Sequence, residues 1–263
     1  MTNKYLARKD APFGAEVWKV LDEAMVEAAK GQLVGRRLLD IEGPFGLGLK
    51  TVPLQDKEDQ DGLITARTLP LSLIREPFTL GARDMASYEH AGIALDTRPV
   101  TTAAIAAARQ EDRLIFEGAS GVPGLLTVEG THQQSLSAWE EVGEAANDLI
   151  QAITALDDAG FHGPYALALA PARYNLLLRL YTRGNKSEME HVRTMATQGV
   201  FKAPVLKGGG VLLSTGRQYA SIALGQDMSI AFIGPAGNEI EFMILESLAL
   251  YVRRPQAICI LKD

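Results

Sequence analysis

Residues 47–80 read LGLKTVPLQDKEDQDGLITARTLPLSLIREPFTL, and this stretch decides what kind of fold the chain adopts. Short runs with β-propensity flank a polar tract at residues 55–62, which ends in the turn signal Asp61-Gly62. Central positions in a sheet are excluded by three prolines, Pro53, Pro70 and Pro77. The pattern predicts a long extended arm that runs out and back. Because an arm buries no core of its own, we interpret it as an assembly arm that lies on a neighbouring subunit; the alternative is an ordinary surface hairpin.

Composition and charge exclude several classes of protein. The 263 residues are 47% apolar, with a net charge of −6 and a pI of about 5.4. This acidic balance argues against a chain that binds nucleic acid or an anionic membrane surface. The single cysteine, Cys259, lies in an apolar run and is expected to be buried rather than reactive. No run approaches the ~20 apolar residues of a membrane helix, and no apolar signal core follows the N-terminus, so we expect a cytoplasmic protein.

Two segments have the apolar spacing of amphipathic helices. Residues 14–39 form the first, in which Gly31 and Gly35 are weak points, and the run closes at residues 42–46. The second covers residues 139–156, where apolar residues recur at intervals of three and four from Trp139 onward, with Ser137 as the predicted N-cap. Shorter helices are predicted at residues 84–89, 99–117, 172–181 and 187–198.

Strands cluster late in the chain and do not alternate regularly with helices. They are predicted at residues 165–170, 211–214, 219–224, 228–233, 239–252 and 257–261. A doubly wound nucleotide-binding sheet would alternate strand and helix throughout. The order therefore predicts an α+β fold.

A search for catalytic motifs finds none. Gly208-Gly209-Gly210 has no Gly-Lys-Ser/Thr ending and precedes a strand, so it does not predict a phosphate-binding loop. The four histidines lie in four separate segments without ligand spacing, which argues against a zinc site. No serine has the context of a nucleophile elbow. These observations indicate that the chain is not an enzyme and holds no metal.

Four segments together resemble the encapsulins, the prokaryotic nanocompartment shell proteins. They are Gly35-Arg36 to Glu42-Gly43-Pro44, then Gly163-Pro164-Tyr165, then Leu224-Gly225-Gln226-Asp227-Met228-Ser229-Ile230, and Arg254-Pro255-Gln256-Ala257 to Ile260-Leu261. Each segment alone has low specificity, but their order and spacing extend along essentially the whole chain.

The resemblance implies the Hong Kong 97 phage major capsid protein-like fold, with a peripheral domain, an extended arm and an axial domain. The peripheral domain would be discontinuous, with the N-terminal helix in residues 1–46, a second part in 81–130 and strands in 225–253. Residues 47–80 would be the extended arm (E-loop). Residues 131–224 would form the axial domain, and residues 254–263 its C-terminal strand.

By the same resemblance, the function is that of a shell subunit that encloses cargo enzymes, commonly a ferritin-like iron protein used in iron storage or a dye-decolourising peroxidase. The cargo's C-terminal targeting peptide would lie on the inner wall. The cargo-peptide-binding positions would be Leu33, Arg36, Asp40, Asp227 and Ile230. A structural alternative is that Arg36 and Asp40, four residues apart on one helix face, form an ion pair.

The resemblance also implies pores and bears on a cofactor. The five-fold pore-lining residues would be Gly184, Asn185, Lys186, Ser187, Glu188 and Glu190, whose charges would filter small ions; the alternative is a solvent-exposed helix start. Some encapsulins bind a flavin through a tryptophan. Arg83 stands at that position here, so we predict no cofactor.

The expected partners are about 60 copies of the chain and a cargo enzyme, without nucleic acid or membrane. Two alternatives remain at this point. A phage or prophage capsid protein of the same fold would usually carry a scaffold or processing segment, whereas this chain enters its first helix after a short segment. A soluble α+β enzyme would form a small oligomer with turnover of its own.

Overall fold

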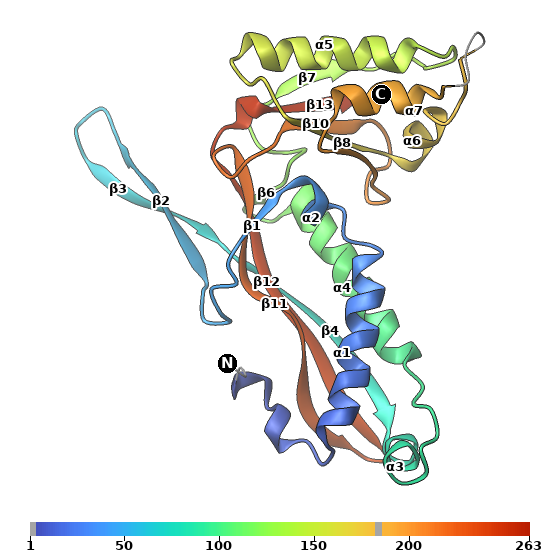
Figure 1. Cartoon of the computed structure of the whole chain (residues 1–263). Coiled ribbons are helices and arrows are strands. Elements are labelled where there is room, and N and C mark those ends of the chain that lie inside the picture. Colours follow the sequence, from blue (N-terminus) through green and yellow to red (C-terminus); the bar gives the residue numbers. More distant parts are fainter. Residues whose placement is uncertain (1–3, 182–185) are drawn as a thin grey trace. The chain divides into compact units, whose positions relative to one another are not determined.

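A computed structural model describes residues 4–181 and 186–263 (Figure 1). The chain divides into two compact units, each discontinuous in sequence. Unit 1 comprises Met1–Leu33, Gly43–Glu111 and Leu224–Leu248. Unit 2 comprises Val34–Glu42, Asp112–Ala223 and Ala249–Asp263. The boundary at 223/224 lies beside the predicted limit of the axial domain, whereas residues 34–42 and 112–130, expected in the peripheral domain, lie in unit 2.

The first long helix of unit 1, α1 (Ala15–Lys30), is shorter than the predicted helix over residues 14–39. It follows two 3₁₀ turns, η1 (Lys4–Leu6) and η2 (Arg8–Asp10). The helix ends at Gly31, one of the two weak points, and a separate short helix, α2 (Gly35–Leu38), begins four residues later in unit 2. The buried face of α1 repeats at helical spacing in Val17, Leu21, Met25 and Ala29.

Four strands form a sheet in the order β1–β11–β12–β4 (Figure 1). They are β1 (Asp40–Glu42), β11 (Ala220–Ala236), β12 (Glu239–Val252) and β4 (Ser72–Gly81). The bounds of β12 agree with the prediction, while the two predicted strands before it are one continuous strand, β11. In unit 1, Phe78 of β4 and Phe242 of β12 are register partners whose rings stack at 5.0 Å, and Trp18 of α1 meets Phe242 edge-on. These aromatic contacts hold α1 against the sheet.

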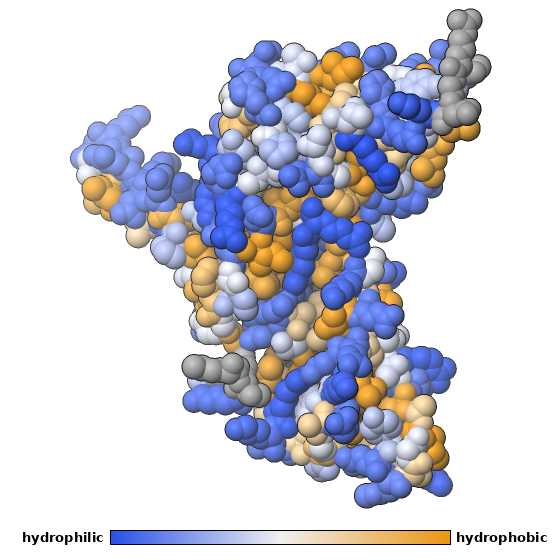
Figure 2. Space-filling model, viewed as in Figure 1, coloured by the Kyte–Doolittle hydropathy of each residue, from blue (hydrophilic) through white to orange (hydrophobic). Residues whose placement is uncertain are grey.

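The arm is confirmed as a hairpin but is shorter than predicted. It consists of β2 (Thr51–Glu58) and β3 (Ile64–Pro70), which pair only with each other. The predicted turn at Asp61-Gly62 is present, and Gly62 has the positive φ of 80° that glycine tolerates. The rest of the predicted arm is β4, which belongs to the sheet. Figure 2 shows the hairpin surface as mostly hydrophilic with hydrophobic patches.

Two helices follow β4 in the chain. They are α3 (Ala82–Ala91) and α4 (Arg98–Phe116), close to the predicted spans. A small hairpin follows, formed by β5 (Gly118–Ala119) and β6 (Val122–Pro123).

Unit 2 contains a five-stranded sheet in the order β7–β13–β10–β8–β9. The strands are β7 (His132–Ser135), β13 (Ile258–Lys262), β10 (Gly210–Ser214), β8 (Tyr165–Leu169) and β9 (Gly199–Lys202). Besides α2 and the end of α4, this unit contains the helices α5 (Glu144–Asp158), α6 (Pro171–Leu176) and α7 (Glu188–Met195), with the 3₁₀ turn η3 (Pro255–Ala257) before β13. Helices set beside one mixed sheet confirm the α+β prediction.

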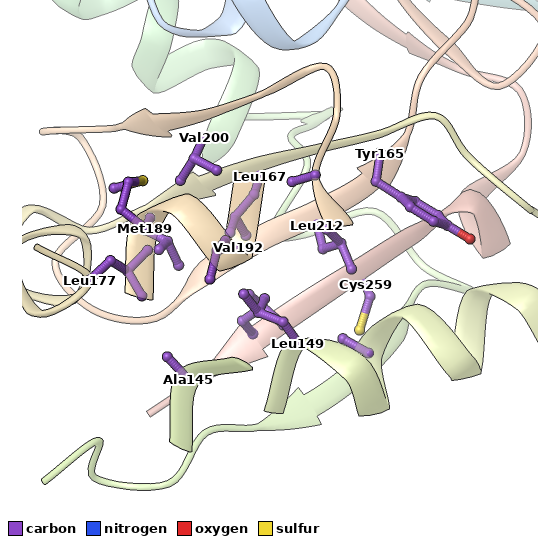
Figure 3. Close-up of a cluster of buried hydrophobic side chains, with 14 of the residues drawn as sticks. Ala145, Leu149, Tyr165, Leu167, Leu177, Met189, Val192, Val200, Leu212 and Cys259 are labelled. Atoms are coloured by element: carbon purple, nitrogen blue, oxygen red, sulfur yellow. The ribbon is translucent and has the colours of Figure 1, made fainter. Parts of the chain in front are cut away.

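The core of unit 2 lies between this sheet and its helices (Figure 3). Leu149 of α5, Leu167 of β8 and Leu212 of β10 are each at most 1% exposed. Cys259 is also fully buried here, and burial raises the pKa of its thiol to about 11. It is therefore a packing residue, as predicted.

The predicted start of α5 at Trp139 is wrong. The helix begins at Glu144, and Trp139 lies before it with a positive φ of 57°. Its indole N–H donates to the buried Asp148 carboxylate at 2.8 Å, and Asp148 also accepts from the N–H and hydroxyl of Ser137. Ser137 thus serves a loop anchored on Asp148, not a capping box.

Candidate functional site

The N-terminal segment of unit 1 is fixed by Arg8. Its guanidinium lies over the Trp18 ring at 4.3 Å and forms a bidentate ion pair with Asp22 of α1. Its Nε donates to the carbonyl of Ile230 in β11 at 2.9 Å. Because a fork-shaped guanidinium meets three different groups at once, the segment, α1 and β11 are joined at one residue.

Three of the predicted peptide-binding residues lie in unit 1. Leu33 is buried in a cluster with Ala29 and Ala108, and Met228 of β11 packs against that cluster. Asp227, next to Met228, is exposed, and its backbone carbonyl accepts hydrogen bonds from Gln226 and Ser229 side chains. The Ile230 side chain is fully buried, so this residue offers its backbone rather than its side chain.

A surface groove of about 610 Å³ lies between the N-terminal segment that carries Arg8 and the first half of α1. Phe13 and Trp18 contribute aromatic surface, while Arg8, Lys19 and Asp22 contribute charge. The groove therefore combines apolar area with charges of both signs, which is the combination that fixes the register of a bound peptide.

Arg36 and Asp40 lie in unit 2, and they do not share a helix face as the ion-pair alternative required. Arg36 belongs to α2, which ends at Leu38, whereas Asp40 is an exposed residue of β1. The start of α2 is held by Asp112, a buried residue of α4. Its carboxylate accepts the N–H groups of Val34 at 3.0 Å and Gly35 at 2.9 Å.

The segment after Arg36 is fixed by a second polar network in unit 2. Glu42 of β1 accepts from Arg253 at 2.8 Å, and Arg253 also donates to the Ser221 hydroxyl at 2.8 Å. Ser221 in turn donates to Glu42. Burial raises the pKa of Glu42, but hydrogen bonds from Ser221 and Arg253 and the nearby arginine charges outweigh burial, so the pKa lies below its usual value. The network joins β1, β11 and the residue that follows β12.

The predicted pore-lining residues divide into three groups. Gly184 and Asn185 lie outside the described residues. Lys186 and Glu190 are exposed, and Ser187 is half-buried and caps α7, accepting from the Glu190 N–H. Glu188 is corrected, because its side chain is 0% exposed and its carboxylate is bound inside unit 2. A buried side chain does not line a pore.

Other searches of the described residues are negative. Among residues 4–181 and 186–263, no group of three or more His, Cys, Asp or Glu side chains is placed to hold a metal ion. Within the same residues, no helix has the length and apolar character needed to cross a membrane. Arg83 is an exposed residue near the start of α3.

Several positioning residues have no signal in the sequence. Arg8 and Asp22 are 14 positions apart, and Asp112 acts on residues 77 and 78 positions away. Neither separation has a periodic signature. The only sequence hint is chemical, since a charged residue at an otherwise apolar helix position, as at Asp112, suggests a buried partner.

Comparison with known proteins gives a consistent result. A family model described as "Encapsulating protein for peroxidase" matches residues 2–249. The chain is 33% identical to the type 1 encapsulin shell protein EncA of Myxococcus xanthus, over 98% of this chain and 96% of that protein.

Solved structures agree in fold. The structure of a virus-like particle from Pyrococcus furiosus superposes with a TM-score of 0.78 at 22% identity, covering 94% of this chain and 100% of that chain. The capsid of Myoviridae phage XM1 gives a TM-score of 0.62 at 14% identity, covering 85% and 88%. These similarities confirm the capsid-like fold.

The family model covers almost the whole chain, and the relative is matched along its length. These proteins are described by the shell that they build, which confirms the prediction of a structural subunit rather than an enzyme. This chain belongs to the encapsulin shell-protein family.

Proposed function

We propose that this chain assembles into a closed icosahedral shell of about 60 copies that encloses a cargo enzyme with a C-terminal targeting peptide. Membership of the encapsulin family along nearly the whole chain carries this proposal. The β2–β3 hairpin supports it, because its strands pair only with each other while Leu63 and Ile64 are 65% and 63% exposed. Two adjacent exposed apolar side chains beside a polar turn suit a contact with a second copy.

The assembly is tested with the purified full chain by negative-stain microscopy and analytical ultracentrifugation. We expect hollow particles with a sedimentation coefficient far above that of a dimer or tetramer. Particles of dimer or tetramer size alone would contradict the shell and favour the alternative of a small soluble oligomer.

The cargo would be a ferritin-like iron protein or a dye-decolourising peroxidase, and the description of the family model names a peroxidase. The proposed peptide-binding positions are Leu33, Arg36, Asp40, Asp227 and Ile230. Exposed Asp227 beside the apolar cluster of Leu33 and Met228 supports a peptide that contributes apolar side chains and a basic group. The Ile230 side chain is buried and its carbonyl accepts from Arg8, so its proposed role is to shape the strand beneath the peptide.

Loading is tested by co-expressing the chain with a reporter protein that carries the cargo's C-terminal peptide. The Arg36→Glu and Asp227→Lys double variant should give intact but empty shells. Reporter that co-purifies at the wild-type ratio would argue against these positions while leaving the shell itself unaffected.

We further propose that the exposed Lys186 and Glu190 and the half-buried Ser187 line a five-fold pore that admits small ions and substrates. The shell would work in the cytoplasm without a cofactor of its own. By the family resemblance, Arg83 would occupy the position of the aromatic ring that stacks on a flavin in some encapsulins. Absence of a flavin absorbance band from the purified shell, before and after incubation with flavin mononucleotide, is the expected result.

A further inference from the structure

Glu188 is the most deeply buried charged group near the proposed pore residues. It begins α7, whose own N-cap is the neighbouring Ser187, so α7 does not need the Glu188 carboxylate as a cap. A carboxylate that is 0% exposed costs several kcal/mol unless it is paired and hydrogen-bonded. Its partners therefore show what it stabilises.

One carboxylate oxygen of Glu188 caps a different helix. Oε1 accepts the N–H of Gly143 at 2.9 Å and of Ala146 at 3.2 Å, at the N-terminus of α5. Gly143, the N-cap position of α5, supplies no side-chain cap. A residue 45 positions away in sequence thus provides the cap, and the positive end of the α5 dipole stabilises the carboxylate.

The other oxygen faces Arg179. Oε2 lies 3.8 Å from the Arg179 guanidinium and accepts no hydrogen bond from the residues that the structure describes. The guanidinium donates to the carbonyls of Leu176 at 3.0 Å and Glu140 at 2.9 Å. Arg179 thus joins the Glu188 carboxylate to the segment that leads into α5.

Arg179 and Glu188 also lie opposite each other in a short two-stranded stem. The Glu188 N–H donates to the Arg179 carbonyl at 3.0 Å, and the Tyr181 N–H donates to the Lys186 carbonyl at 3.1 Å. An isolated bridge joins Leu180 to Ser187 between them. Burial, with a smaller contribution from the Glu188 charge, raises the pKa of Tyr181 above its ordinary value.

We propose that the part-exposed Arg179 and the buried Glu188 form a clamp that fixes this stem against the N-terminus of α5 and so positions Lys186 and Glu190. The link between the clamp and a pore rests on the proposed function, whereas the clamp itself does not. Its direct contacts are all within unit 2. Glu188 acts through its partners, so it is a positioning residue and not part of the pore surface.

The first test is hydrogen–deuterium exchange of the full chain in its assembled form, read on the peptide that spans residues 140–148. Glu188→Gln keeps an acceptor oxygen but loses the charge. The exchange rate at the start of α5 should then rise about tenfold, the change expected for one weakened charge-assisted hydrogen bond. Glu190→Gln, in the same turn of α7 but exposed, is the matched control and should leave this rate unchanged. An unchanged rate in Glu188→Gln would overturn the clamp.

The second test separates the clamp from general destabilisation. A double-mutant cycle of Arg179→Met and Glu188→Leu measures the urea midpoint of each single variant and of the pair. We expect the pair to lose less stability than the sum of the two single losses, because Arg179→Met leaves the buried Glu188 carboxylate without its cation, a cost that Glu188→Leu removes. Additive losses would contradict a direct coupling.

The third test reads the pore. In shells, Glu188→Gln should shift the ratio of entry rates of a small cation and an anion of equal size, while the entry rate of a neutral solute stays within about twofold. An unchanged ratio together with faster exchange in α5 would refute the pore but retain the clamp. If the wild-type chain forms no shell, the proposed function fails, and the exchange and cycle results still decide the clamp.

Discussion

The position of Arg36 depends on Asp112. This aspartate is 4% exposed in α4, and it accepts the N–H groups of Val34, the N-cap, and Gly35, the first residue of the short helix that carries Arg36. A four-residue helix has too few internal hydrogen bonds to be stable alone. A side chain from a distant segment therefore fixes both its start and its direction.

Asp112→Ala should lower the free energy of unfolding by about 3 kcal/mol, because it leaves two buried N–H groups without their charged acceptor. Asp112→Asn, which keeps one acceptor oxygen, should cost about 1 kcal/mol. Urea denaturation followed by circular dichroism measures both. Glu117→Ala, an exposed acidic residue just beyond α4, is the control and should change stability by less than about 0.5 kcal/mol. Equal midpoints for Asp112→Ala and the control would refute the role of Asp112.

Local sequence predicts the break in the first helix but not the helical turn after it. Gly31 and Gly35 are weak points in the apolar spacing, and the helix does end at Gly31. The restart at Gly35 depends on Asp112, and a Cβ at Gly35 would lie 2.5 Å from the Ile115 side chain. Neither contact has a local pattern. The same reason explains Glu188, whose sequence position beside a predicted pore gives no sign that it caps a distant helix.

At the scale of elements, β1 is the most weakly supported strand of its sheet. It has three residues and pairs in parallel with residues 221–223 of β11. The network of Glu42, Ser221 and Arg253 adds side-chain hydrogen bonds to this short ladder.

This network predicts a pH dependence. The pKa of Glu42 is lower in the folded chain than its ordinary value of about 4.5, so the carboxylate stabilises the fold above that value. The stabilisation is lost as the pH falls from about 4.5 through the folded pKa. Glu42→Gln should lower the urea midpoint at pH 7 and should flatten its decline between about pH 5 and pH 3. Exposed Glu239 gives the matched control, Glu239→Gln, and a decline as steep in Glu42→Gln as in this control would contradict the assignment.

Elements with their own periodicity were predictable, and those defined by tertiary pairing were not. The buried face of α1 and the bounds of β12 followed from apolar spacing. The end of the arm did not, because the sequence of β4 has the same extended character as the arm. Only its pairing with β12, as at Phe78 and Phe242, shows that it belongs to the sheet. Trp139 fits the helical spacing of α5 but lies outside the helix, since its indole N–H is bound by Asp148.

At the scale of the whole molecule, family membership and the exposed hairpin tip converge on assembly. Leu63 and Ile64 are adjacent residues at the end of the hairpin, and each is about two thirds exposed. Burying one such side chain stabilises a contact by roughly 1.5–3 kcal/mol. Since a closed shell repeats the contact in every copy, a modest loss per subunit would accumulate over the proposed shell of about 60 copies.

Replacing both tip residues by aspartate, Leu63→Asp with Ile64→Asp, should therefore abolish shells without unfolding the subunit. The hairpin tip lies outside the two hydrophobic clusters described above, around Leu149 and around Leu33. The urea midpoint and the circular dichroism spectrum should therefore match those of the wild-type subunit dissociated under the same conditions. Sedimentation should show subunits or small oligomers instead of particles. Gln60→Asp, which adds a charge at the same exposed turn without removing apolar surface, should still assemble. Wild-type particles from the double aspartate variant would mean that the tip contributes no essential contact, and loss of particles in Gln60→Asp would point to charge repulsion instead of apolar burial.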